Sequence, residues 1–182
     1  TTTPFANGTG TAVTSANLSA GVFSVNLVGL VSPGTTFYYH TYATNAGGTG
    51  YSAQGTFTTA TPTLSATSLT AFGNVCINTT AGPNSFTITG SNLTAANITV
   101  AALAGFTYST TSGGTYTTTL SLTQPGGSYS QQIFVKFNPT AVQSYNGNIA
   151  VGGGGGATVN VAATGAGVNT TPSVTAGAAS AI

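Results

Sequence analysis

Apolar residues alternate with hydroxyl and amide residues along most of the chain, which is the pattern of β-strands with one buried face. The clearest case is the predicted strand at residues 131–138, where Ile133, Val135 and Phe137 share one face. Gly, Asn and Pro interrupt the pattern about every ten residues, a spacing typical of sandwiches and barrels. Helix signals are almost absent, so the sequence predicts an all-β chain.

The first part of the chain holds three predicted strands, at residues 22–30, 37–44 and 51–59. The second of them is rich in aromatic residues, and alternation places Tyr38, His40 and Tyr42 on one of its faces. A Thr-Ala-Thr-Pro sequence ends this part of the chain. Because Pro and small polar residues mark linkers, we expect a module boundary near residue 61.

The second part of the chain is longer and has the same style. Its predicted strands are residues 63–68, 73–77, 84–90, 98–101, 115–122, 129–138, 145–151 and 157–163. This number of short antiparallel strands fits an immunoglobulin-like sandwich. Residues 168–182 begin with a linker-like sequence and hold mostly small side chains, so we expect them not to fold alone.

The composition changes the picture because charge is almost missing. The chain has 182 residues with one Lys or Arg and no Asp or Glu, and 1% of its residues are charged, against roughly 25% in ordinary domains. Thr, Ser and Asn supply the polar surface instead. A surface without charge does not repel its neighbours, so we expect self-association.

The missing charge also excludes several classes of function. Without carboxylate side chains, the paired-acid chemistry of glycosidases and aspartic proteases is impossible, and calcium sites lose their usual ligands. A net charge of +1 offers no footprint for nucleic acid. No run approaches the ~18 apolar residues of a membrane-spanning helix. We therefore predict no enzyme activity, no cofactor, no metal, no nucleic-acid partner and no transmembrane segment.

Three single residues invite chemical interpretations that the rest of the sequence does not support. His40 and Cys76 are too few ligands for zinc, so we interpret His40 as a sheet-face residue and Cys76 as a small buried residue or an intermolecular disulfide partner. Lys136 could suggest an isopeptide bond, but no acid is present to assist it, so we interpret it as a solvent-facing lysine. Asn-x-Ser/Thr sequences leave glycosylation open at Asn7, Asn17, Asn78, Asn92, Asn97 and Asn169.

Tyrosines are concentrated in the first part of the chain. Tyr38, Tyr42 and Tyr51 form a candidate platform for stacking against sugars or protein ligands, since aromatic faces suit both. Packing into a core explains the same tyrosines equally well, because one face of each strand must be buried.

Residues 1–61 carry a Pro-Gly-Thr turn at 33–35, the aromatic strand, and an Ala-Thr-Asn sequence at 43–45 before a Gly-rich hairpin. This order resembles the second half of a fibronectin type III module of bacterial surface proteins. Phe37 departs from the family tyrosine at this corner, and His40 stands where Arg is common. The resemblance implies an incomplete module whose first strands precede Thr1.

Residues 62–167 contain Phe-Gly-Asn-Val at 72–75, and three further motifs at 86–93, 135–140 and 145–149. In this order the motifs are similar to the Hydin-type immunoglobulin-like modules of bacterial cell-surface repeat proteins. Residues 168–182 resemble the linker and opening strand of a following fibronectin type III module. The resemblance implies two immunoglobulin-like antiparallel β-sandwich modules in tandem, the first incomplete, within a tandem array.

These expectations lead to one main functional hypothesis and two alternatives. The main hypothesis is a structural repeat unit of a long secreted or cell-surface bacterial protein, such as a stalk, adhesin or extracellular filament. Residues 168–182, with Val174, Ala176 and Ile182, would dock by β-strand addition on the first module of the next copy. The alternatives are a glycan-binding or host-protein-binding adhesion module, and an accessory region of a larger extracellular enzyme.

Overall fold

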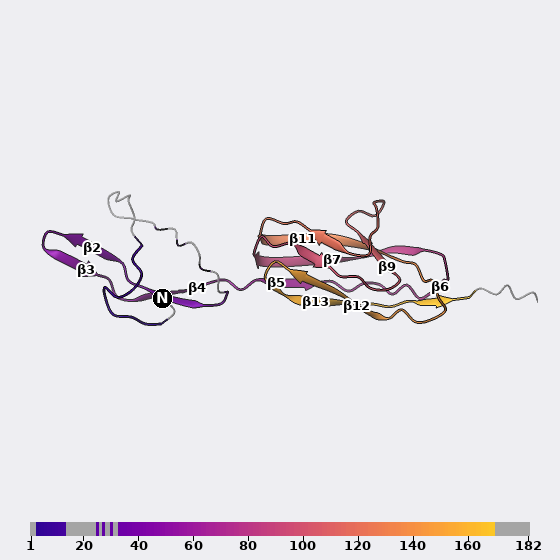
Figure 1. Ribbon diagram of the computed structural model, residues 1–182, viewed down its shortest axis with the longest axis horizontal. Helices are drawn as coiled ribbons and strands as arrows, with labels where there is room; N and C mark the ends of the chain where they lie inside the picture. Colours follow the sequence, from indigo (N-terminus) through magenta and orange to yellow (C-terminus); the bar gives the residue numbers. More distant parts are fainter. Residues whose placement is uncertain (1–2, 14–24, 26, 28–29, 31–32, 170–182) are drawn as a thin grey trace, which may run out of the picture. The chain divides into compact units, whose positions relative to one another are not determined.

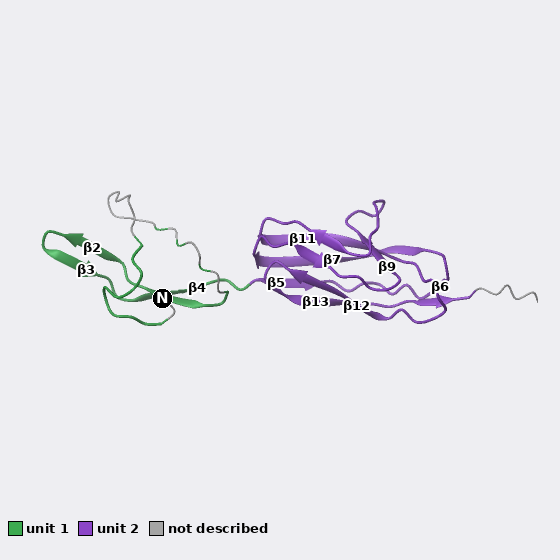
Figure 2. Cartoon of the chain, viewed as in Figure 1, with its two compact units in different colours: residues 1–61 green, residues 62–182 purple. Residues whose placement is uncertain are grey.

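A computed structural model describes residues 3–13, 25, 27, 30 and 33–169. The described residues are all-β, with no helix among them, and they form several mostly antiparallel sheets. The chain divides into two compact units, Thr1–Thr61 and Pro62–Ile182 (Figure 2). The strand predicted at residues 22–30 lies largely outside the described residues.

Unit 1 contains one long hairpin that is interrupted by a bulge. Its outer half pairs β2 (Tyr42–Asn45) with β3 (Gly48–Tyr51), and its inner half pairs β1 (Thr36–Tyr39) with β4 (Gly55–Thr58), both antiparallel. Between the halves, two residues of the first strand face three of the second, residues 52–54.

The bulge corrects the prediction of unbroken strands at 37–44 and 51–59. One extra residue shifts the register, so each predicted strand becomes two short ones. The halves stay joined through Ser52, whose backbone N–H donates to the Thr41 carbonyl at 2.9 Å. Alternation was therefore a valid guide to the faces only on each side of the break.

The described residues of unit 2 form ten strands. They are β5 (Thr63–Ala66), β6 (Asn74–Cys76), β7 (Ala81–Leu93), β8 (Ile98–Val100), β9 (Phe106–Ser109), β10 (Leu120–Leu122), β11 (Gly127–Phe137), β12 (Gly147–Gly153), β13 (Gly156–Ala163) and β14 (Ala166–Val168). Two four-stranded antiparallel sheets have the orders β5-β7-β11-β9 and β10-β8-β12-β13, and β14 pairs in parallel with β6 (Figure 1).

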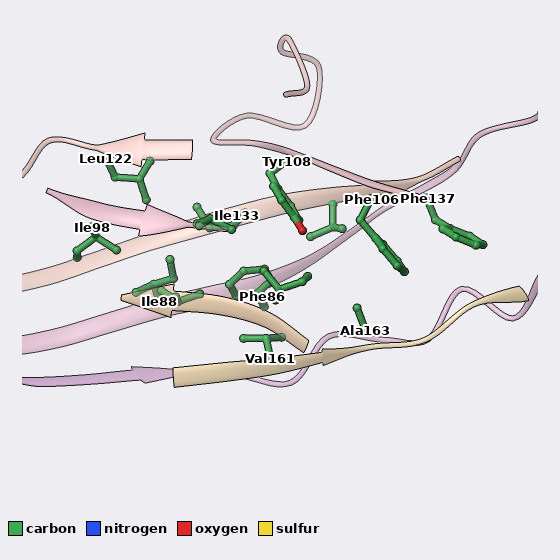
Figure 3. Close-up of a cluster of buried hydrophobic side chains, with 14 of the residues drawn as sticks. Phe86, Ile88, Ile98, Phe106, Tyr108, Leu122, Ile133, Phe137, Val161 and Ala163 are labelled. Carbon is green, nitrogen blue, oxygen red and sulfur yellow. The ribbon is translucent and has the colours of Figure 1, made fainter. Parts of the chain in front are cut away.

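The core of unit 2 lies between these two sheets. Ile133, Val135 and Phe137 of β11 are fully buried, which confirms the predicted apolar face of this strand. Figure 3 shows Tyr108 and Ile133 on one side of the buried layer and Val161 on the opposite side. One continuous cluster of apolar side chains from both sheets is the arrangement of a β-sandwich.

The structure differs from the predicted strands of unit 2 at three places. Only Leu120–Leu122 of the predicted strand 115–122 is a strand, although Thr117 makes an isolated bridge to Tyr108. The sequence analysis missed β9 and β14, which are short and are held by partners distant in the sequence. Val168 was expected to begin the linker-like segment 168–182, but it pairs with Cys76 inside unit 2.

Two polar side chains fix the loops of unit 2. Gln124 is buried, donates from Nε2 to the carbonyls of Thr94 and Ala96 at 2.6 Å each, and accepts the Gly126 N–H at 2.6 Å. Tyr145, before β12, accepts the backbone N–H of residues 140 and 141 at 3.1 and 2.9 Å on its hydroxyl. Each satisfies backbone groups that β-strands leave unpaired at a corner.

Candidate functional site

Of the residues that invited chemical interpretations, His40 belongs to unit 1, and Cys76 and Lys136 belong to unit 2. The described residues contain no group of three or more His, Cys, Asp or Glu side chains that could hold a metal ion. The half-buried Lys136 places its Nζ 4.2 Å from the centre of the Tyr116 ring, a cation–π contact. It is thus not simply a solvent-facing lysine. The free thiol of Cys76 is half-buried in β6.

His40 lies in the bulge of the unit 1 hairpin and bonds across it to both ends of the opposite segment, residues 52–54. Its Nδ1 is 3.0 Å from the Ser52 carbonyl, which can only accept, so Nδ1 carries the proton. Its Nε2 is 3.2 Å from the amide nitrogen of Gln54, from which the neutral ring accepts. The Phe5 ring meets the imidazole edge-on, with ring centres 5.2 Å apart. His40 therefore joins the N-terminal segment to the bulge.

The structure brings two of the three candidate stacking tyrosines together. Tyr42 and Tyr51 are cross-strand partners with ring centres 5.9 Å apart, and they are 41% and 39% exposed. Together with Thr41, Ala43, Gly50 and Ser52 they border a shallow hollow of about 370 Å³. Tyr38 lies beyond the bulge on β1, opposite Thr56, and does not line this hollow.

A second aromatic surface lies on the inner half of the hairpin. The rings of Phe37 and Phe57 stack with centres 5.5 Å apart, and the ring of Tyr39 lies 6.3 Å from that of Phe57. Tyr39 also covers Gly55, its partner across the strands. We call Phe37, Tyr39 and Phe57 the aromatic face of unit 1.

This aromatic face is only partly buried. Phe37 and Phe57 are half-buried and Tyr39 is 43% exposed, and no described residue of unit 1 is fully buried. Most of the exposed large apolar side chains among the described residues belong to unit 1: Val13, Leu27, Tyr39, Tyr42 and Tyr51. The described residues of unit 1 thus form paired strands without the fully buried layer that stabilises a packed sheet.

The electrostatic setting of this surface is neutral. The chain has no carboxylate side chain, and its single Lys or Arg side chain, Lys136, belongs to unit 2. Covering the aromatic face therefore removes no charged side chain of unit 1 from water. Such a surface can bind apolar or hydrogen-bonding partners.

The remaining predicted site residues, Val174, Ala176 and Ile182, lie outside the described residues. Among the residues that the structure describes, there is no helix of the length and hydropathy needed to cross a membrane. A scan against models of protein families finds no match, and a search of curated protein sequences finds no match either. The resemblances stated above remain predictions.

Proposed function

We propose that this chain is a structural repeat unit of a long secreted or cell-surface bacterial protein, forming part of a stalk, adhesin or extracellular filament. The observation that carries the proposal is the contrast between the two units. Unit 2 has a closed apolar core, whereas unit 1 has a partly exposed aromatic face and no fully buried residue among those described. Unit 1 therefore gains stability from a neighbour that covers it.

We propose further that unit 2 is an immunoglobulin-like module. The order β5-β7-β11-β9 matches strands A, B, E and D of that fold, and β8-β12-β13 matches strands C, F and G. Tyr145 supports this because it bonds back to the chain just before β12, as the corner tyrosine of strand F does. One departure is β10, which follows β9 in the chain yet pairs with β8.

The composition supports a structural role over catalysis. With one Lys or Arg and no Asp or Glu, contacts between copies bury hydroxyls, amides and apolar groups, not ions. Burying ions costs several kcal/mol each unless they are paired, so neutral surfaces pack at a lower cost. This account includes no enzyme activity and no cofactor.

Sedimentation velocity on the purified chain over a range of concentrations tests the proposal. We expect concentration-dependent assembly that persists when ionic strength rises from about 0.01 M to about 1 M, since the Debye length then falls from about 30 to about 3 Å with few charges to screen. A chain that stays monomeric at all concentrations, or assembles only at low salt, would contradict the proposal.

A second candidate function is recognition of a glycan or a host protein, which the Tyr42–Tyr51 pair favours. The two exposed rings and the hollow beside Gly50 offer a stacking surface with backbone groups at its edge. Saturable binding of soluble oligosaccharides, measured by calorimetry, should then be lost in Tyr42→Ala. It should be kept in Tyr116→Ala, a matched change in unit 2. Equal binding by both variants would rule out this surface.

A further inference from the structure

We propose that the outer edge of β4, together with the aromatic face, receives residues 170–182 of a second copy of this chain as an added strand. The inference rests on the proposed self-association and names the segment and the surface that produce it. Three features of the described residues carry it: an open strand edge, the shape and neutrality of the face beside that edge, and the position of β14 in unit 2.

Within the described part of unit 1, the edge of β4 is open at Thr56 and Thr58. The Thr59 N–H donates to the Thr35 carbonyl at 3.0 Å, so residues 35 and 59 form a hydrogen-bonded pair of the antiparallel ladder. Because such pairs alternate, the N–H and C=O groups of Thr56 and Thr58 point away from β1. Both residues are exposed, and no described strand pairs with β4 on that side.

An exposed strand edge of this kind is a template for an incoming strand. The added strand would extend the β1–β4 sheet and place alternate side chains beside Phe57 and Gly55, on the aromatic face. Residues 174, 176 and 182 have the same parity, so an extended segment presents all three on one side. Val174 and Ala176 are small, which suits packing next to bulky rings, and the segment carries no charged side chain.

The geometry of unit 2 favours a second copy over the chain's own unit 1. The chain enters unit 2 before Thr63, which pairs with Ser91 near the C-terminal end of β7. It leaves unit 2 after Val168, which pairs with Cys76. Cys76 lies shortly before Ala81, the N-terminal end of β7. Entry and exit thus lie at opposite ends of β7. Residues 81 and 91 are about 34 Å apart at roughly 3.4 Å per residue.

A segment returning along its own unit 2 would use most of its length. Residues 170–182 reach at most about 45 Å when fully extended. After running back along β7, the segment would have about three residues left. These are too few to pair along β4, because β4 precedes the linker that leads into unit 2. A copy placed beyond the exit of unit 2 presents its β4 without this return.

Complementary variants of the full chain test the proposal by sedimentation velocity. Thr56→Pro removes an outward N–H from β4 without removing a bond to β1, so it blocks the receiving edge. Val174→Asp places a carboxylate in the donated strand, which blocks donation. The matched control is Val142→Asp, which adds the same charge at a side chain of unit 2 that is 61% exposed.

We expect each blocking variant alone to stay monomeric at concentrations where the wild type and Val142→Asp assemble. A one-to-one mixture of the two variants should form a dimer and nothing longer, because one donor and one receiving edge remain. A mixture that stays monomeric while the wild type assembles would overturn the proposal. So would a chain lacking residues 170–182 that assembles like the wild type. In those two cases self-association survives without this docking mode, whereas a monomeric wild type would overturn the proposed function itself.

Discussion

Tyr108 offers the sharpest single-residue test of the core of unit 2. Its side chain is 0% exposed, and its hydroxyl is buried without a hydrogen-bond partner. Figure 3 shows the oxygen pointing into the apolar cluster. Burying a hydroxyl without a partner costs about 1–3 kcal/mol in proteins. Because Tyr108→Phe keeps the ring and removes this cost, we expect the variant to be more stable than the wild type.

The expected gain is about 1–2 kcal/mol. Removing one oxygen leaves a void of roughly 10 Å³, which costs only about 0.2 kcal/mol at ~24 cal/mol per Å³. For a unit of this size each kcal/mol raises Tm by about 4 °C, so the expected rise is roughly 4–8 °C. The assay is urea unfolding at pH 7 followed by circular dichroism, with Tyr129→Phe, a half-buried tyrosine of the same unit, as the control.

The pH dependence gives an independent arm of the same test. Burial raises the pKa of Tyr108 to about 12, and the nearby Leu103 backbone, which the hydroxyl does not reach with hydrogen-bond geometry, offsets only part of this. A raised pKa in the folded state means that stability is full below pH ~10 and falls as the pH rises toward ~12. At 1.36 kcal/mol per pKa unit the loss is about 2 kcal/mol by pH 12, and Tyr108→Phe should escape it. A variant that is destabilised, or that shows the same alkaline loss, would refute the reasoning.

Three further predictions concern unit 2 and unit 1. Gln124→Ala should lower the free energy of unfolding by about 2–3 kcal/mol, because two carbonyls and one N–H lose a buried partner. Gln132→Ala, on the exposed face, should change the free energy of unfolding by less than about 0.5 kcal/mol. Urea unfolding measures both values, and equal effects would contradict the role of the buried Gln124 hydrogen bonds. Tyr145→Phe should destabilise unit 2 by an amount that grows with pH, because hydrogen bonds to the Thr140 hydroxyl and to the backbone of Ala141 and Thr140 lower the pKa of Tyr145 in the folded state. The stability that the tyrosine hydroxyl adds is therefore full above pH ~10 and decreases as the pH falls through the folded-state pKa. A loss of stability in the variant that stays constant from pH 8 to ~10.5 would contradict this. His40→Ala should loosen the bulge and speed amide exchange at Ser52 and Gln54, which hydrogen–deuterium exchange measures. Unchanged exchange at these two residues would show that His40 does not hold the bulge together.

The sequence predicts the strands of unit 2 well where one face is fully buried. In β11 the alternation of Ile133, Val135 and Phe137 is clear because every second residue enters the core. The prediction misses β9 and β14 because short strands are decided by distant partners, such as β6 for β14, which local patterns do not contain.

The candidate site in unit 1 was harder to predict for two physical reasons. A bulge inserts one unpaired residue into a strand, and the residue types around it are the same as in a regular strand. The local pattern therefore did not show that Tyr38 would be separated from Tyr42 and Tyr51. Alternation also identifies which side chains share a face, but it does not say whether anything covers that face. Counting residue pairs outward from the Gly-rich turn gives the pairing of Phe37 with Phe57 only if the extra residue of the bulge is taken into account.

We propose, above all, that a neighbouring copy completes unit 1 in an assembly of neutral subunits. Cryo-electron microscopy of the native material, with mass spectrometry of its peptides, tests this most directly. We predict assemblies that repeat with one copy of the chain, acid-free peptides, and an added strand beside Thr56 and Thr58 that covers Phe57. Isolated monomeric particles, or assemblies in which the β4 edge and the aromatic face stay open to solvent, would contradict the claim.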